Sequence, residues 1–243
     1  MTATIIEIRG LNKRFGVGDA ETLALRDVNL KIKSGEFVMV TGPSGCGKTT
    51  LLNIIGLLDR ATYGEYYLDN HPVARISKRK QARLRNEKIG TIFQNFNLIQ
   101  GMTVIENVAL PLIYRGVGKT KRLKTASRML GRFQLNEREY YLPNQLSGGQ
   151  QQRVAIARSL VGNPSIILAD EPTGNLDSRA SHIVMEELRE IHEQGNTIIM
   201  VTHNANLTAY ATRVINIIDG HIDTDININK RVAKNPARQR RRR

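Results

Sequence analysis

The stretch FVMVTGPSGCGKTTLLNIIGLL, residues 37–58, decides the fold of this chain. Its first part, FVMVTG (residues 37–42), is an apolar run that is typical of a strand buried in a parallel sheet. The next part, GPSGCGKT (residues 42–49), fits the pattern G-x-x-x-x-G-K-[ST] without a gap, and LLNIIGLL (residues 51–58) indicates a helix. The backbone N–H groups of such a loop, together with a helix N-terminus, can surround an anion. The stretch therefore predicts a phosphate-binding loop between a buried strand and a helix.

The residue types of this loop indicate what it binds. Lys48 can reach the β- and γ-phosphates of a nucleotide, and the Thr49 hydroxyl can ligate Mg²⁺. Cys46 is interpreted as a small filler of the loop, because no His lies nearby in the sequence to activate its thiol. The expected nucleotide contacts are Gly42, Pro43, Ser44, Gly45, Cys46, Gly47, Lys48, Thr49 and Thr50.

Outward from this loop, short apolar strands alternate with helices. Strands are predicted at residues 28–32, 89–93, 165–170, 196–203 and 214–218. Helices are predicted from residue 103, where Thr103 and Glu106 have capping-box spacing, and at residues 119–133 and 180–194. The dipeptide Asp219-Gly220 predicts a β-hairpin. This pattern predicts an α/β protein with a parallel sheet and a helical insertion near its middle.

Two adjacent acids, Asp170 and Glu171, follow the apolar run SIILA in SIILAD (residues 165–170). A charge at the end of a buried strand is costly unless it is paired or bound to a metal. We expect Asp170 to hold Mg²⁺, directly or through water, and Glu171 to orient and polarise the water that attacks a γ-phosphate. The alternative is a solvated strand end without a catalytic role.

The pentapeptide LSGGQ, residues 146–150, predicts a second anion site. Ser147 and Gln150 have capping-box spacing just before the helical run VAIARSLV (residues 154–161). Gly148 and Gly149 let another backbone approach, and the helix N-terminus offers unpaired N–H groups and a partial positive charge. The alternative is an ordinary capped helix.

These motifs, in this order, resemble those of the ATP-binding-cassette (ABC) ATPases over about residues 5–225. The motifs are the phosphate-binding loop, Gln94 at the end of IGTIFQ, LSGGQ, Asp170-Glu171, Asn175-Leu176-Asp177 and His203. The resemblance implies a RecA-like P-loop NTPase parallel sheet with an N-terminal antiparallel β subdomain and a helical insertion subdomain. We expect an ABC ATPase domain at residues 1–228, with the helical subdomain at about residues 95–160, and a basic, disordered tail at residues 229–243.

The resemblance also implies roles for single residues, with ATP and Mg²⁺ as the ligands. Gln94 is expected to sense Mg²⁺ and the attacking water, and to couple them to a membrane partner. His203 is expected to contact the γ-phosphate and Asp177 to link the two sites of a dimer. Phe15 is expected to stack on adenine, where the family more often has Tyr, and the alternative is a Phe of the core. The expected catalytic residues are Lys48, Gln94, Glu171 and His203, and the expected Mg²⁺ ligands are Thr49, Gln94 and Asp170.

The assembly expected from these motifs is a head-to-tail homodimer. Each ATP with its Mg²⁺ lies between the phosphate-binding loop of one copy and Ser147, Gly148, Gly149 and Gln150 of the other. The stretches GLLDRATYGEY, FQNFNLIQGMTVIENVALPLIYRG and LADEPTGNLDS further resemble the lipoprotein-releasing and macrolide-exporter ATPases. This resemblance implies a separate integral-membrane permease, a place at the cytoplasmic face of the membrane, and export or extraction of a lipoprotein, peptide or drug-like substrate.

Two other functions share some of these features. A regulatory ATPase that drives a cell-wall hydrolase through a membrane partner would carry the same motifs. A soluble DNA-maintenance ABC ATPase is disfavoured, because such proteins have a long coiled coil between the two motif halves, and residues 95–145 show no extended heptad pattern.

Charge and composition narrow the possible partners. More than half of the net charge of +14 comes from eight Lys or Arg residues within residues 229–243, and RISKRKQARLRNEK (residues 75–88) predicts an exposed basic helix. Either stretch could contact anionic lipid headgroups. A nucleic-acid partner is disfavoured, because aromatic residues are 5% of the chain and Trp is absent. One cysteine, no signal peptide and no membrane-spanning apolar run indicate a reducing compartment and a peripheral protein.

Overall fold

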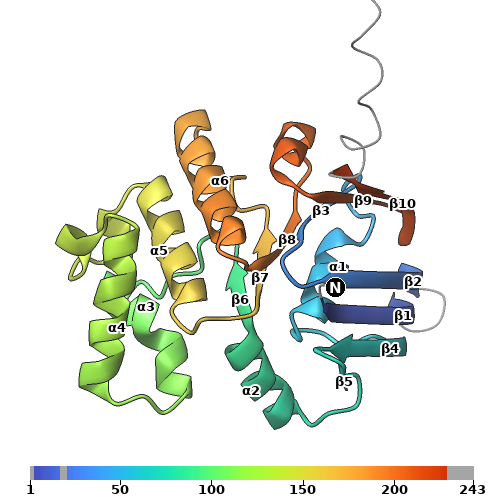
Figure 1. Cartoon of the computed structure of the whole chain (residues 1–243), viewed down its shortest axis with the longest axis horizontal. Helices are drawn as coiled ribbons and strands as arrows, with labels where there is room; N and C mark the ends of the chain where they lie inside the picture. The colour runs from blue at the N-terminus through green and yellow to red at the C-terminus, as the bar shows by residue number, and fades with distance from the viewer. Residues whose placement is uncertain (1–2, 17–20, 229–243) are drawn as a thin grey trace, which may run out of the picture.

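The computed structural model describes residues 3–16 and 21–228, and it contains two β-sheets with helices packed around them (Figure 1). The basic stretch at residues 229–243, expected to be a disordered and lipid-contacting tail, lies outside the described residues. Among the described residues, no helix is long and apolar enough to cross a membrane.

A six-stranded sheet forms the centre of the molecule. Its strand order is β10-β9-β3-β8-β7-β6, and every neighbouring pair is parallel except β9 and β10. The strands are β3 (Phe37–Thr41), β6 (Ile89–Ile92), β7 (Ile166–Asp170), β8 (Thr197–Val201), β9 (Arg213–Ile218) and β10 (His221–Asn227). Asp219 and Gly220 have φ values of 46° and 82° and form the predicted turn between β9 and β10.

A second, antiparallel sheet of four strands covers one side of this centre. Its strand order is β2-β1-β4-β5. The strands are β1 (Thr4–Phe15), β2 (Thr22–Lys33), β4 (Tyr63–Leu68) and β5 (His71–Pro72). This sheet is the antiparallel subdomain that the family resemblance implied, although only residues 28–32 within β2 were predicted as a strand from the pattern.

Helices occupy the connections between the parallel strands. They are α1 (Lys48–Ile55), α2 (Lys78–Lys88), α3 (Val104–Tyr114), α4 (Lys119–Arg132), α5 (Gly148–Leu160) and α6 (Ser178–Glu193), with a short 3₁₀ helix η4 (Ala205–Tyr210). Helices α3, α4 and α5 gather beyond β6, while α1 lies beside the antiparallel sheet (Figure 1). The Glu106 carboxylate accepts hydrogen bonds from the Thr103 N–H at 2.9 Å and the Thr103 hydroxyl at 2.8 Å. These hydrogen bonds cap the N-terminus of α3, as predicted.

The central sheet separates two hydrophobic cores. In β3, Phe37 and Met39 belong to the core shared with α3–α6, whereas Val38 and Val40 belong to the core shared with α1 and the antiparallel sheet. This alternation follows from the two-residue period of a strand, and both faces are apolar because helices or strands cover both. The apolar run therefore forms the predicted parallel strand over residues 37–41, and residues 37–40 are buried.

One helix boundary agrees with the prediction and one differs from it. Helix α5 begins at Gly148, directly after the cap at Ser147 that the capping-box spacing predicts, and ahead of the apolar run that starts at residue 154. Two glycines in the first turn of α5 lower the helix propensity there, so the pattern of apolar residues shows only the later turns. Helix α1 begins at Lys48, inside the phosphate-binding loop, and ends at Ile55 before Gly56.

Candidate functional site

The phosphate-binding loop connects β3 to α1, and contacts with the surrounding backbone fix its shape. Gly42 has a φ of 143°, and a Cβ at this position would clash with the carbonyl oxygen of Ile217 and lie 2.8 Å from Cys46 Sγ. Gly47 has a φ of 105°, and a Cβ there would clash with the carbonyl oxygen of Ala24. Positive φ values and close backbone approach both require glycine at these positions.

Lys48 is the charged centre of this loop, and its side chain is buried. Its Nζ donates to the carbonyl oxygens of Gly42 at 2.9 Å and Pro43 at 2.6 Å, and lies 3.7 Å from Cys46 Sγ. The ammonium group is thus held among the carbonyls of its own loop. Cys46 is buried and fills the loop beside Lys48, which agrees with its interpretation as a filler.

The structure brings Thr49 and Asp170 together across 121 positions of sequence. Thr49 Oγ1 donates a 3.4 Å hydrogen bond to Asp170 Oδ1. Burial raises the pKa of Asp170, and the neighbouring Glu171 charge raises it further, while Thr49 and Lys48 act in the opposite direction. A carboxylate and a hydroxyl at this distance suit a hard cation that prefers oxygen ligands. Among the described residues, no group of three or more His, Cys, Asp or Glu side chains is placed to hold a metal ion.

Glu171 and His203 form the second pair of the site. Glu171 has a φ of 44°, and its N–H donates to the carbonyl oxygen of Val201 at 3.0 Å, next to the last β7–β8 pair, Asp170 and Val201. Glu171 Oε2 lies 3.0 Å from His203 Nδ1. A non-glycine residue with positive φ is uncommon, and such strain is often found at functional sites. The carboxylate is therefore held in one orientation by its backbone and by His203.

Gln94 lies in the loop after β6, next to the loop that follows Glu171. A Cβ at Gly174 would lie 2.8 Å from Gln94 Nε2, so the Gln94 side chain packs against the Gly174 backbone. Asn175 Nδ2 donates to the Gln94 carbonyl oxygen at 3.1 Å and to Asn95 Oδ1 at 2.8 Å. The two loops are thereby connected, but no contact of Gln94 with Thr49 or Asp170 is found among the described residues.

The LSGGQ motif forms the capped start of α5, as predicted. The Ser147 N–H donates to Gln150 Oε1 at 2.9 Å, and the Gln150 N–H donates to Ser147 Oγ at 3.3 Å. A Cβ at Gly149 would lie 3.1 Å from Ala180 Cβ, so glycine lets the start of α5 approach the start of α6. Ser147 is exposed, and its helix N-terminus is available to an anion.

Asp177 and Phe15 are also placed by the structure. Asp177 is the N-cap of α6, where its Oδ1 accepts a 2.7 Å hydrogen bond from the Ala180 N–H, so this carboxylate has a structural role within one chain. Phe15 ends β1 with its side chain 45% exposed, and the Nζ of Lys13 lies 4.7 Å from the centre of its ring. The ring face is therefore accessible for stacking.

The predicted site residues fall into two separate groups. The phosphate-binding loop, Asp170, Glu171 and His203 gather at the C-terminal ends of β3, β7 and β8, where parallel α/β sheets usually bind ligands. The start of α5 lies on the other side of β6 and β7 from α1 (Figure 1). One chain therefore does not bring Ser147–Gln150 to its own phosphate-binding loop.

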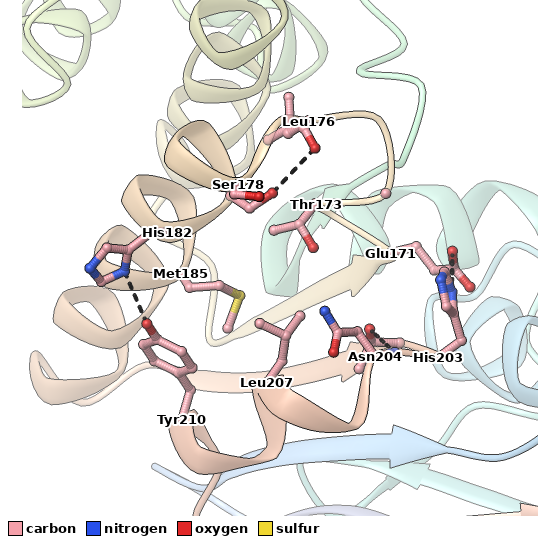
Figure 2. A pocket seen from close by; sticks show the side chains of 13 residues that line it. Glu171, Thr173, Leu176, Ser178, His182, Met185, His203, Asn204, Leu207 and Tyr210 are labelled. Atoms are coloured by element: carbon pink, nitrogen blue, oxygen red, sulfur yellow. Dashed lines mark hydrogen bonds and ion pairs between the residues drawn. The ribbon is translucent and has the colours of Figure 1, made fainter.

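A cavity of about 470 Å³ opens beside Glu171 and His203. Figure 2 shows the Glu171–His203 pair at one end and the hydrogen bond between His182 and Tyr210, 3.2 Å from Nδ1 to the hydroxyl, at the other. Leu207 of η4 and Met185 of α6 lie between these ends (Figure 2). The cavity leaves the Glu171–His203 pair open to solvent.

Sequence reasoning missed the residues that support the Gln94 loop. Asn175 was recognised only as part of a motif, and Arg158 of α5, which donates to two carbonyl oxygens of this loop, was not singled out. The available signal was an arginine within the otherwise largely apolar helical run VAIARSLV (residues 154–161).

Comparison with known proteins agrees with this arrangement. A model of the family described as ABC transporter matches residues 25–174. An uncharacterised ABC transporter ATP-binding protein of Methanocaldococcus jannaschii is 50% identical over 223 residues, which are 92% of this chain and 100% of that protein. The macrolide export ATP-binding/permease protein MacB of Aggregatibacter actinomycetemcomitans is 48% identical over 235 residues, which are 96% of this chain but 36% of that protein.

Solved structures share the fold. A dimeric ATP-binding cassette in a post-hydrolysis state, bound to ADP and Pi, has a TM-score of 0.85 and 44% sequence identity, and the match covers 92% of this chain and 98% of that chain. A dimeric bacterial ABC transporter cassette matches with the same values.

Proposed function

The chain belongs to the ABC transporter family as one of its ATPases, and we propose that two copies of it bind and hydrolyse ATP at shared sites to drive a separate membrane permease. The observation that carries this proposal is the separation of the two anion-binding ends within one chain (Figure 1). A phosphate bound at Lys48 leaves the N-terminus of α5 unused, and a second copy placed head to tail would bring the two ends together.

The residues on the nucleotide side have distinct proposed roles. Lys48 exchanges the carbonyl oxygens of its own loop for the β- and γ-phosphates, while Thr49, Asp170 and Gln94 hold Mg²⁺, which neutralises phosphate charge. Phe15 stacks on the adenine. Thr49 and Asp170 are within hydrogen-bond distance of each other, and Phe15 is exposed where a ligand can reach it. Gln94 would join them only when the ligand is bound.

Glu171 and His203 would carry the hydrolytic step. Glu171 accepts a hydrogen bond from the attacking water and orients it toward the γ-phosphate. The 3.0 Å contact between Glu171 Oε2 and His203 Nδ1 fixes the carboxylate, and the other ring nitrogen of His203, Nε2, can contact the γ-phosphate. The γ-phosphate completes the contact between two copies, so ATP binding favours the closed dimer and hydrolysis releases it.

A groove of about 1170 Å³ offers a contact surface for a permease. It lies between α2, β6, α3 and the end of α5, and it includes Asn97 from the Gln94 loop. Tyr114 and Leu58 line it with 76% and 47% of their surfaces exposed. Large exposed apolar side chains in one groove are typical of a protein-binding site. A permease segment docked here would contact the loop that carries Gln94.

The proposed cargo and location follow from the relatives. The macrolide exporters join an ATP-binding part to a permease, and the chain spans about a third of their length. The Methanocaldococcus relative is covered in full, which favours a partner permease encoded separately. We place the dimer at the cytoplasmic face of a membrane, where it powers export or extraction of a lipoprotein, peptide or drug-like molecule.

The test of this function uses two exposed tyrosines. Tyr114 lies in the groove with 76% exposure, and Tyr140 lies outside it with 78% exposure. In membranes from cells that produce the full-length protein, Tyr114→Asp should lower the membrane-bound fraction at least about fivefold, because a charge in an apolar contact costs more than about 1 kcal/mol. Tyr140→Asp should leave it within about 1.5-fold of wild type. Equal loss from both variants, or no loss from Tyr114→Asp, would exclude the groove as the permease contact.

A further inference from the structure

Arg158, near the end of α5, reaches across to the loop that carries Gln94. Its Nη1 donates to the Asn97 carbonyl oxygen at 2.6 Å, and its Nη2 donates to the Phe96 carbonyl oxygen at 2.8 Å. Burial lowers the pKa of the guanidinium, which nevertheless stays protonated. The guanidinium is partly buried and donates two hydrogen bonds to one loop, so it makes a specific contact and is not a solvated surface group.

The two carbonyls belong to strained backbone. Phe96 has a φ of 58° and Asn97 a φ of 49°, so two consecutive non-glycine residues adopt the left-handed conformation. Asn tolerates this conformation, but for a bulky residue such as Phe it is disfavoured. The planar guanidinium has two donors in a fixed fork, and its geometry matches two neighbouring carbonyl oxygens. Arg158 therefore stabilises a turn that the sequence itself disfavours.

The opposite side of the same loop is held by Asn175. Its Nδ2 donates to the Gln94 carbonyl oxygen and to Asn95 Oδ1, and the Gln94 side chain packs on Gly174. Residues 94–97 are thus clamped between the loop after Glu171 and the helix that begins with the LSGGQ motif. A shift on the α5 side of this clamp would move Gln94 relative to Glu171.

We propose that Arg158 is a positioning residue for ATP hydrolysis: it holds the turn at Phe96 and Asn97 and thereby makes the LSGGQ helix and the Gln94 loop move as one unit. This inference rests on the proposed ATPase function and deepens it. Arg158 does not contact the nucleotide. It acts through the backbone of residues 94–97, which fixes where the Gln94 side chain lies.

The same arginine faces the groove proposed for the permease. Both Arg158 and Asn97 line that groove, so a docked segment would contact the clamp directly. A conformational change in the groove would then be transmitted to Gln94 through Asn97 and Phe96. It would be transmitted to the start of α5 through Arg158 and the helix itself. The turn at Phe96 and Asn97, which is strained and hydrogen-bonded to Arg158, links the groove to Gln94. Substitution of Arg158 tests whether this link acts on hydrolysis.

The experiment compares two arginines on α5 in the full-length protein. Arg153 is the matched control, because its Nη1 donates a single 3.0 Å hydrogen bond to the Phe133 carbonyl oxygen, away from the Gln94 loop. Lysine can replace one donor but not a planar fork. We expect Arg158→Lys to lower kcat for ATP by about 10- to 100-fold with KM within about twofold, since small misplacements affect the reacting geometry more than binding. Arg153→Lys should keep kcat within about twofold.

A second substitution separates positioning from general damage. Glycine adopts positive φ without steric cost, so Asn97→Gly should let the turn keep its shape with less help from Arg158. The double variant Asn97→Gly/Arg158→Lys should regain at least about threefold in kcat over Arg158→Lys alone. Unchanged kcat in Arg158→Lys, equal losses in Arg153→Lys, or no recovery in the double variant would each overturn the proposal. An inactive wild-type protein would instead contradict the ATPase function.

Discussion

The two ends of this molecule that we propose to bind anions are built in different ways. The phosphate-binding loop is enclosed, with Lys48 buried among carbonyls of its own loop and Gly42 and Gly47 pressed against neighbouring backbone. The LSGGQ end is open. Ser147 is exposed at the start of α5, and its capping box with Gln150 supplies its hydrogen bonds. Contacts within the chain fix the shape of the phosphate-binding loop, whereas the LSGGQ end is an exposed surface that a second copy can contact.

This difference shows how a site can be divided between two copies. The enclosed end must have its shape before ATP arrives, because its N–H groups have to point inward. The open end needs only an exposed helix N-terminus and small residues that allow close approach. Mutations that change backbone packing should therefore cost more stability at the enclosed end than at the open end.

The largest expected effect on stability comes from Gly42→Ala. The added Cβ would clash with the Ile217 carbonyl oxygen at a φ of 143°, so we expect a loss of about 3 kcal/mol or more in the free energy of unfolding. Urea unfolding monitored by circular dichroism measures it. The control is Gly149→Ala at the open end, where the nearest atom is Ala180 Cβ at 3.1 Å and the loss should stay below about 1 kcal/mol. Similar losses in both variants would remove the distinction between the two ends.

A smaller effect is expected behind the open end, at Glu187 of α6. Burial raises the pKa of Glu187 from its ordinary value of 4.5 to about 7, against the favourable charge of Arg153 on α5. Among the described residues, its Oε2 has no hydrogen-bond partner. The folded state then binds more protons than the unfolded state between pH 4.5 and 7, so this group makes stability fall as pH rises through that window.

Glu187→Gln should remove this pH dependence. At pH 8 we expect the variant to be about 1 to 2 kcal/mol more stable than wild type, and at pH 4 the two should be alike. Thermal unfolding across this pH range measures the difference. The exposed Glu193→Gln on the same helix is the control and should show no such gain. A variant that is less stable than wild type at pH 8 would mean that the Glu187 charge is well compensated by Arg153.

The smallest expected effect on stability comes from Ser147→Ala, which removes the cap of α5. We expect a loss of about 1 kcal/mol, and the same loss from Ser77→Ala, since Ser77 caps α2 with a hydrogen bond of the same length, 3.3 Å. ATP hydrolysis should distinguish them: Ser147→Ala should lower kcat at least about tenfold, and Ser77→Ala should leave it within about twofold. Equal rates in the two variants would show that Ser147 serves only as a cap.

Much of the fold could be predicted because its strands are buried on both faces. Continuous apolar runs such as residues 37–42 and 165–170 have few alternatives to a parallel strand. Strands β1 and β4 were not predicted, because Gly10 with its φ of 55° interrupts the first and exposed residues dominate the start of the second. The start of α5 was predicted by the capping-box spacing of Ser147 and Gln150, whereas the apolar pattern alone shows only the later turns.

The residues of the candidate site could be predicted better than the residues that hold them in place. Contiguous motifs identified Lys48, Asp170 and Ser147, and the structure places them at strand and helix ends, although their roles stay predictions. Arg158 and Glu187 were not identified, since a charged residue in a helix usually faces water. Only tertiary contacts, which bring α5 to the Gln94 loop and α6 to Arg153, show that these two are partly buried.

The dimer completed by ATP is the central claim, and Glu171→Gln tests it most directly. Without the carboxylate, hydrolysis should fall at least about 100-fold while the phosphate-binding loop still binds ATP. Light scattering after size-exclusion chromatography, with saturating ATP and Mg²⁺, should then give twice the mass of one chain, and one chain's mass without nucleotide. A Glu171→Gln protein that binds ATP but keeps the mass of a single chain would contradict the account.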